Sequence, residues 1–230
     1  MSMVQLQDLR AKILSIPGKR MRSDLVGRLR LYGEKMQKAR ITLEKTINGQ
    51  KQSSCVFPHF DFSDSVTPAL KATSTAKTLA ARLTKEPTVI KSKGTDKSIV
   101  NISNFAETSL NELRNQWKKA VTGKTQTFQS IAKAATDAKL KGCNELNILL
   151  YSIVNKATSP PFTCDQAETI RKQFEDLLTV ISELGLEGDV LDFILNAAKG
   201  SADPKALYNP LVKEFVERHS LWQSLRVRLS

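Results

Sequence analysis

The stretch that decides the fold is Leu25-Val-Gly-Arg-Leu-Arg-Leu-Tyr-Gly-Glu-Lys-Met-Gln-Lys-Ala-Arg-Ile-Thr-Leu-Glu-Lys-Thr46. Its seam residues recur at alternating intervals of four and three, the heptad spacing that places side chains on one side of a helix. The seam consists of Leu25, Leu29, Tyr32, Met36, Ala39, Leu43 and Thr46. The pattern predicts a coiled-coil-like helix that ends near Asn48-Gly49.

A shorter helical pattern precedes the seam. Leu6, Leu9, Ile13 and Ile16 share one helical face, and Pro17-Gly18 then interrupts the pattern. Because the two patterns are out of phase, the break predicts a kink or a helical hairpin. Residues 1–49 are therefore expected to form a basic, coiled-coil-like helical segment.

Residues 50–103 differ in composition, since they are rich in Ser, Thr and Lys and contain three of the prolines. We expect an irregular basic linker here. It would carry one short helix, which begins at Thr67-Pro68 and ends at Glu86-Pro87, and an exposed loop over residues 91–97.

Residues 104–230 have the pattern of a compact helical bundle domain. The expected breaks between its helices are Thr122-Gly123, Gly142, Pro160-Pro161, Gly185, Gly200 and Asn209-Pro210. The final Leu225-Arg-Val-Arg-Leu229 alternates strictly, which predicts a short terminal strand; the alternative is that the helix carrying Trp222 continues to the end. The predicted fold class is thus mainly α.

The charge is large and uneven. The formal net charge is +12, and residues 1–55 carry 12 Lys/Arg against 4 Asp/Glu, residues 56–142 carry 14 against 7, and residues 143–230 carry 9 against 12. This asymmetry indicates an acidic partner, which could be nucleic acid, an anionic membrane surface or an acidic protein. The alternative is a solvated charged face.

Cysteine usage and hydropathy indicate the compartment. The three cysteines, Cys55, Cys143 and Cys164, are far apart and form no Cys-x-x-Cys pair, which favours a reducing environment. The first ten residues are too polar for a signal peptide, and the longest nearly apolar run, residues 148–154, is much shorter than a membrane span. A cytoplasmic protein without membrane contact is expected.

One motif raises the question of nucleotide hydrolysis. Gly123-Lys124-Thr125 matches the end of a phosphate-binding loop, Gly-x4-Gly-Lys-Ser/Thr. The first glycine of that motif would have to stand at position 118, which is Lys118 in an expected helix. A helix end at Gly123 followed by a new helix start at Thr125 explains the same three residues.

No other catalytic or metal-binding arrangement is supported. Cys55, His59 and Asp61 are suitable zinc ligand types, but the second Cys or His pair of a structural site is missing. His219 is the other histidine, and it is expected at a helix end. We therefore expect a non-enzymatic protein without a metal site or a cofactor.

The basic N-terminal segment is the candidate nucleic-acid site. The candidate residues for duplex backbone contact are Lys19, Arg20, Arg22, Arg28, Arg30, Lys35, Lys38 and Arg40. The candidate residues for docking on a partner protein are Leu25, Leu29, Tyr32, Met36 and Leu43 of the seam and Leu225, Val227 and Leu229 of the terminal strand. In a parallel homodimer, Lys35 at heptad position g of one chain would face Arg40 at heptad position e of the other chain. These like charges repel each other, so such a dimer is disfavoured.

These observations favour a non-enzymatic helical subunit that docks on a larger protein and contacts nucleic acid. A bacterial DNA-processing or antiviral phage-defence system is a hypothesis that rests on the character of the chain and on no motif. The alternative is an adaptor whose basic face binds an acidic protein without nucleic-acid contact.

Overall fold

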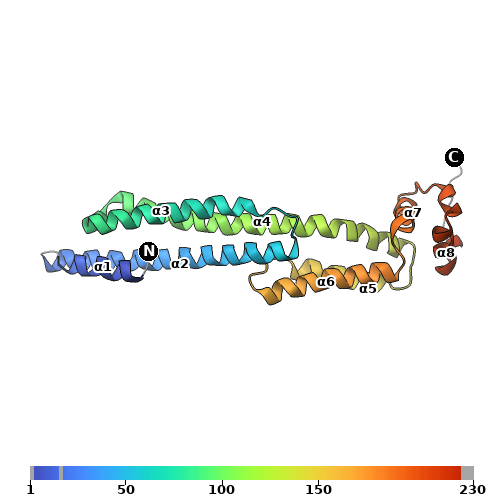
Figure 1. Ribbon diagram of the computed structural model, residues 1–230, viewed down its shortest axis with the longest axis horizontal. Coiled ribbons are helices and arrows are strands. Elements are labelled where there is room, and N and C mark those ends of the chain that lie inside the picture. Colours follow the sequence, from blue (N-terminus) through green and yellow to red (C-terminus); the bar gives the residue numbers. More distant parts are fainter. Residues whose placement is uncertain (1–2, 16–17, 224–230) are drawn as a thin grey trace. The chain divides into compact units, whose positions relative to one another are not determined.

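The computed structural model describes residues 3–15 and 18–223, and these residues form helices without a strand, which confirms the mainly α fold class (Figure 1). The chain divides into two compact units. Unit 1 comprises residues 1–117 and 160–163, and unit 2 comprises residues 118–159 and 164–230. This division falls at residues 117 and 118, whereas the sequence suggested a boundary at residues 103 and 104.

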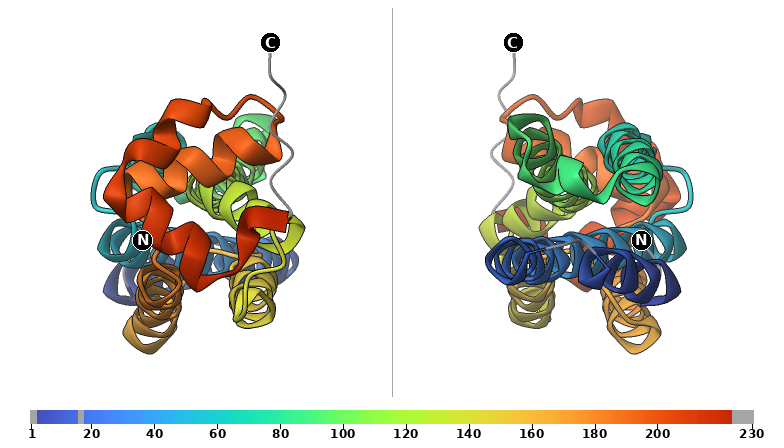
Figure 2. Two further views of the ribbon diagram at one scale, coloured as in Figure 1. Left: turned by 90° about the vertical axis from the view of Figure 1, so that its right-hand side faces the viewer. Right: turned by 90° about the vertical axis from the view of Figure 1, so that its left-hand side faces the viewer.

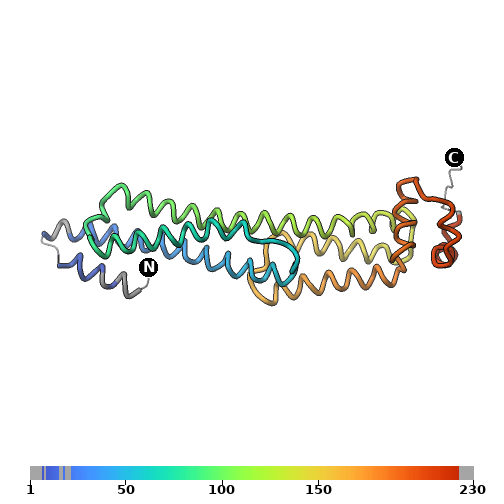
Figure 3. The backbone as a smooth tube through the Cα atoms, turned by 45° about the horizontal axis from the view of Figure 1, so that its top comes forward, coloured from blue at the N-terminus to red at the C-terminus, as the bar shows by residue number. Residues whose placement is uncertain are grey.

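Unit 1 is built from α1 (Met3–Leu14), α2 (Lys19–Val56), η1 (Ser63–Ser65), α3 (Val66–Lys85), η2 (Pro87–Lys91) and the first part of α4 (Lys93–Asp137). Helix α1 packs on α2 and runs back along it, so these two helices form a helical hairpin, one of the two arrangements expected (Figure 3). The successive helices α2, α3 and α4 alternate in direction (Figure 1).

The seam forms the centre of the unit 1 core. Leu25 is fully buried, and Leu29, Tyr32, Ala39 and Thr46 are also buried. Met36 and Leu43 pack against the same cluster, which includes residues of α1, α3, η2 and α4. The seam therefore faces this chain's own helices, and Leu25, Leu29, Tyr32, Met36 and Leu43 do not form a free surface for a partner protein.

Helix α2 does not end near Asn48-Gly49 as expected; it continues to Val56. A Cβ atom at Gly49 would lie 2.8 Å from Leu113 Cδ2 and 2.8 Å from Phe162 Cε1. Glycine at this position therefore permits the close approach of α2 to these side chains. The expectation failed because a glycine required for close packing looks the same in the sequence as a glycine that ends a helix.

Two glycines of α2 should respond oppositely to alanine. Gly27 is exposed, and a Cβ atom at this position would meet no other atom within 4 Å, whereas Gly49 is buried against Leu113. We expect Gly27→Ala to raise the free energy of unfolding by about 0.5–1 kcal/mol, the usual helix gain. Gly49→Ala should lower it, because fully buried Leu113 has little room to move. Urea denaturation of both variants measures the difference; a stabilised Gly49→Ala protein would contradict this packing.

Residues 50–103 are not an irregular linker. Most of them lie in helices that pack in unit 1, where Ala72, Leu79, Leu83, Ile90 and Ile99 are buried. The helix expected from Thr67-Pro68 is α3, and it ends before Glu86-Pro87 as predicted. Helix α4 begins at residue 93, within the expected loop. The sequence pattern did not predict that these residues pack in unit 1, because their apolar side chains are widely spaced among Ser, Thr and Lys.

Unit 2 contains the second part of α4, α5 (Cys143–Lys156), α6 (Cys164–Glu183), α7 (Gly188–Ala198), η3 (Pro204–Tyr208), α8 (Pro210–Arg218) and η4 (Leu221–Gln223). Its core includes Phe128 of α4 against Phe174 of α6, with ring centroids 6.3 Å apart. The breaks expected before α5, α6, α7 and α8 are confirmed. Helix α8 ends at Arg218, so Trp222 lies outside the helix that was expected to carry it.

Helix α4 is one helix across the expected break at Thr122-Gly123. Thr125 Oγ1 donates to the Val121 carbonyl oxygen at 2.8 Å, and both residues are buried on either side of exposed Gly123. A glycine within a helix costs about 1 kcal/mol relative to alanine, and burial of the flanking residues offsets this cost. The predicted terminal strand, with Leu225, Val227 and Leu229, lies outside the described residues.

Candidate nucleic-acid interface

The predicted cations of α2 do not share one face of the helix. At about 100° per residue, Lys38 and Arg40 point about 160° away from each other. Lys35 and Lys38 are exposed and form no ion pair within the described part of the chain. The side chains of Lys19 and Arg20 lie outside the described residues. Helix α2 alone is therefore not a continuous basic strip.

Several of these cations already have partners. Arg30 Nε lies 3.2 Å from Glu34 Oε1, and Arg40 Nε lies 2.7 Å from Glu44 Oε1. These pairs are exposed and four residues apart, so each contributes only a few tenths of a kcal/mol.

Two further cations of the predicted set serve contacts within unit 1. Arg28 lies 3.9 Å from Asp96 Oδ2, and Arg22 Nη1 donates to the Leu14 carbonyl oxygen at 3.2 Å. The contact of Arg22 spans the turn between α1 and α2, which places this cation at one end of unit 1.

The fold adds a second group of cations at that end. The turn from α3 through η2 to α4 packs against α1 and the beginning of α2 (Figure 2, right). We call the cations of these two turns whose side chains the structure describes the basic end; they are Lys12, Arg22, Arg82, Lys85, Lys91, Lys93 and Lys97. They come from five helical elements and are as much as 85 residues apart in the sequence.

Two contacts hold the turns of the basic end together. Lys12 Nζ donates to the Thr84 carbonyl oxygen at 3.2 Å, which joins α1 to α3. Lys91 Nζ lies 2.7 Å from Asp24 Oδ2, which joins η2 to α2. The hydrogen bond and the charge of Lys91 lower the pKa of the Asp24 carboxyl, so Asp24 remains ionised and paired at neutral pH.

The acidic residues of this region are used internally. Asp96 accepts a hydrogen bond from Tyr32 Oη and also lies near Arg28, while Glu86 Oε1 accepts from Thr88 Oγ1 at 3.0 Å. Burial, together with the bond to Asp96, raises the pKa of Tyr32, which therefore stays protonated as the donor.

Four cations of the basic end form neither an ion pair nor a side-chain hydrogen bond within the described residues, whereas Lys12 and Arg22 bond to carbonyl oxygens and Lys91 pairs with Asp24. The four are Arg82, Lys85, Lys93 and Lys97, and all are exposed. They were not among the cations predicted from the sequence, because they lay in the expected linker and loop. One signal could have identified them: residues 65–85 contain no acidic residue.

The helix directions add to the positive potential of this end. Helices α2 and α4 both begin here, and a helix N-terminus carries a partial positive charge that favours anions. Ser92 Oγ accepts from the Thr95 amide at 3.2 Å and caps α4. Lys93 and Lys97 in the first turns of α4 are unfavourably placed for the helix dipole, and an anion bound there would offset this cost.

The motif Gly123-Lys124-Thr125 does not form a phosphate-binding loop. It lies within α4, where the backbone amides of these residues are used by the helix and cannot surround a phosphate. Lys124 Nζ lies 5.7 Å from the centroid of the Phe128 ring on the next turn. The motif is therefore a segment of an uninterrupted helix, with Thr125 buried and Gly123 and Lys124 exposed.

The histidines and cysteines are likewise dispersed. His219 is the C-cap of α8, and its ring packs at a tilt against Phe215, with centroids 4.5 Å apart; burial lowers its pKa. Cys55 and Cys164 are exposed free thiols. In the described ranges, no group of three or more His, Cys, Asp or Glu side chains could hold a metal ion.

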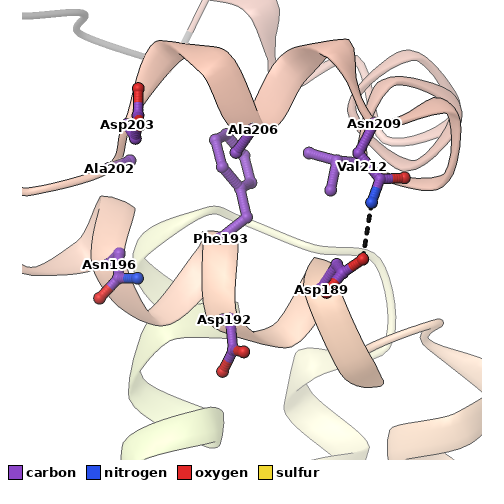
Figure 4. A pocket seen from close by; sticks show the side chains of 9 residues that line it. All are labelled: Asp189, Asp192, Phe193, Asn196, Ala202, Asp203, Ala206, Asn209 and Val212. Atoms are coloured by element: carbon purple, nitrogen blue, oxygen red, sulfur yellow. Dashed lines mark hydrogen bonds between the residues drawn. The ribbon is translucent and has the colours of Figure 1, made fainter.

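A cavity of about 280 Å³ lies between α7, η3 and α8 (Figure 4). Three of the polar side chains that line it form hydrogen bonds within the local structure. Asp203 Oδ1 accepts from the Lys205 amide and Asn209 Oδ1 accepts from the Leu211 amide, each at 2.9 Å, while Asn209 Nδ2 donates to Asp189 at 2.6 Å. The cavity thus belongs to the joint between these short helices.

Comparisons with protein-family models, curated proteins and solved structures find no match to this chain. Among the described helices, none has the combination of length and apolar composition needed to cross a membrane.

Proposed function

We propose that this protein is a non-enzymatic, cytoplasmic helical subunit that binds the phosphate backbone of duplex nucleic acid through the basic end of unit 1. The observation that carries the proposal is the presence of four exposed cations without acidic partners among the described residues: Arg82, Lys85, Lys93 and Lys97. Unit 1 has 20 Lys/Arg against 10 Asp/Glu, which would attract a polyanion from a distance.

The composition of the basic end favours backbone contact over base reading. Lysines predominate, and lysine binds phosphate as a point charge, whereas bidentate recognition of guanine favours arginine. Stacking on single strands would require exposed aromatic side chains beside the basic end, where Tyr32 is buried and bonded to Asp96. We therefore expect similar affinity for duplexes of different sequence.

The test replaces the four unpaired cations together. In Arg82→Gln/Lys85→Gln/Lys93→Gln/Lys97→Gln, binding to a random-sequence duplex is measured by fluorescence anisotropy over a range of salt concentrations. Each phosphate contact contributes about 0.9 to the slope of log K against log salt, so loss of all four should reduce the slope by about 3.6. Glutamine retains good helix propensity, so helical circular dichroism should be unchanged.

A second quadruple variant controls for the general loss of charge. Lys45, Lys51, Lys71 and Lys77 are exposed lysines of unit 1 outside the basic end and outside the predicted duplex-contact set, and their replacement by Gln removes the same number of charges. We expect a much smaller change in slope. Equal changes in the two variants would show that binding follows net charge and not the basic end.

The proposal includes a protein partner, for which α5 offers the better surface now that the seam is known to be buried. Ile148 and Tyr151 are 68% and 72% exposed. Asn144, Asn147 and Asn155 beside them are uncharged, and aromatic residues with few charges are typical of protein interfaces. If the chain binds an acidic protein but no duplex in a salt-dependent manner, the adaptor alternative replaces the nucleic-acid proposal.

A further inference from the structure

A second polyanion surface is present in unit 2, on the part of α4 that follows residue 117. Its three cations are Lys118, Lys119 and Lys133, and all are exposed. The exposed residues between them on the same face are Thr122, Gln126, Gln129 and Ser130. At about 100° per residue these seven positions fall within about 120° of the helix circumference, so they form one continuous strip, which we call the α4 lysine face.

The lysines of the α4 lysine face are not paired with acidic residues within the described part of the protein. Helix α4 has no acidic residue between Glu112 and Asp137. Lys118, Lys119 and Lys133 form no ion pair among the residues that the structure describes, even though Asp137 follows Lys133 by one helical turn. Arg171 of α6, by contrast, lies 3.5 Å from Glu175, the arrangement that usually stabilises an exposed helix cation.

The uncharged residues of this face suit a phosphate backbone. Thr, Ser and Gln side chains donate hydrogen bonds to phosphate oxygens, and small residues allow a nucleic-acid strand to approach the helix. Lys118 and Lys133 are about 22 Å apart along the helix at 1.5 Å per residue. Such a strip can contact several phosphates, which are spaced by about 3.4 Å along the axis of each strand.

The same composition argues against a protein partner at this face. A protein interface has an apolar centre, and the large apolar residues exposed in the described part of unit 2 lie on α5, α6 and later elements. A second copy of this chain would bring lysines against lysines. From residue 143 onward the chain has 9 Lys/Arg against 12 Asp/Glu, so the positive potential of unit 2 is concentrated on α4 and its end.

We infer that the α4 lysine face binds the phosphate backbone of the duplex as a second contact surface. The inference rests on the proposed function, since it assigns a further surface for the same class of partner. It adds that unit 2 contributes to nucleic-acid binding even though its charge is nearly balanced, with 15 Lys/Arg against 13 Asp/Glu.

The experiment compares two triple variants of the full chain on a random-sequence duplex. Lys118→Gln/Lys119→Gln/Lys133→Gln removes the α4 lysine face. Lys156→Gln/Lys199→Gln/Lys213→Gln removes three exposed lysines elsewhere in unit 2 and serves as the control. If all three α4 lysines contact phosphate, the slope of log K against log salt falls by about 2.7 in the first variant, and the control changes it much less.

The outcomes separate this inference from the proposed function. Equal slopes for the two triple variants overturn the inference, while a parent protein that still binds in a salt-dependent manner leaves the basic end as the binding surface. A parent protein that shows no salt-dependent duplex binding, but does bind a poly-glutamate chain, overturns both. A larger loss in the α4 variant than in the control, with unchanged helical circular dichroism, supports the second surface.

Discussion

Replacing Trp117 by Ala should lower the free energy of unfolding by about 3–5 kcal/mol, the usual cost of removing a large buried aromatic side chain. Trp117 is fully buried, and its ring packs against Phe57 with centroids 5.2 Å apart. The variant leaves a cavity in the core of unit 1 where α4 passes the end of α2. For a chain of this length, each kcal/mol lowers the melting temperature by about 2–4 °C.

The other tryptophan supplies the control for this prediction. Trp222 is 48% exposed, so Trp222→Ala should change the free energy of unfolding by less than about 1 kcal/mol. Denaturant unfolding followed by circular dichroism measures both variants. Similar losses in the two variants would contradict the placement of Trp117 in the core.

Leu25→Ala should destabilise the isolated protein by about 2–5 kcal/mol, because Leu25 is fully buried in unit 1. The comparison with Leu31→Ala makes this test specific. Leu31 lies on the same helix and is 49% exposed, so its replacement should cost less than about 1 kcal/mol.

This pair of leucines also tests the two interpretations of the heptad seam. A seam that binds another protein would leave the melting temperature of the isolated chain nearly unchanged in Leu25→Ala. A seam that forms the core of unit 1 lowers it by several degrees. Thermal unfolding of the purified variants therefore determines whether the seam serves this chain or a partner.

Helical periodicity was sufficient to predict the fold class and many of the helix boundaries. The seam residues of α2 are buried or partly buried on one face, as their spacing required, and α8 begins at Asn209-Pro210 as expected. These features depend on neighbours within one or two turns, so a single sequence contains the necessary information.

The helix ends that were predicted wrongly depend on contacts beyond neighbouring turns. Gly49 and Gly123 were expected to end helices, but whether a glycine ends a helix depends on what packs around it. Gly49 lies against Leu113 and Phe162, which are distant in the sequence. Neither contact has a local signature in the sequence.

The candidate site was less predictable than the fold. Of the predicted cations, Arg22 lies at the basic end, while Arg28, Arg30 and Arg40 have acidic neighbours. The basic end also needs Arg82, Lys85, Lys93 and Lys97, which join it only because η2 packs against α1 and α2. Local charge density indicates how many cations are available, but the topology decides which of them are neighbours and which are neutralised.

The position of Phe162 in the sequence has a consequence for synthesis on the ribosome. Residues 160–163 belong to unit 1, and Phe162 lies against Gly49, yet residues 118–159 of unit 2 are translated before them. At roughly 5–20 residues per second, several seconds pass between the emergence of Trp117 and that of Phe162. Unit 1 therefore cannot complete its packing cotranslationally before much of unit 2 has been made, and a nascent chain stopped at residue 117 lacks part of its native core.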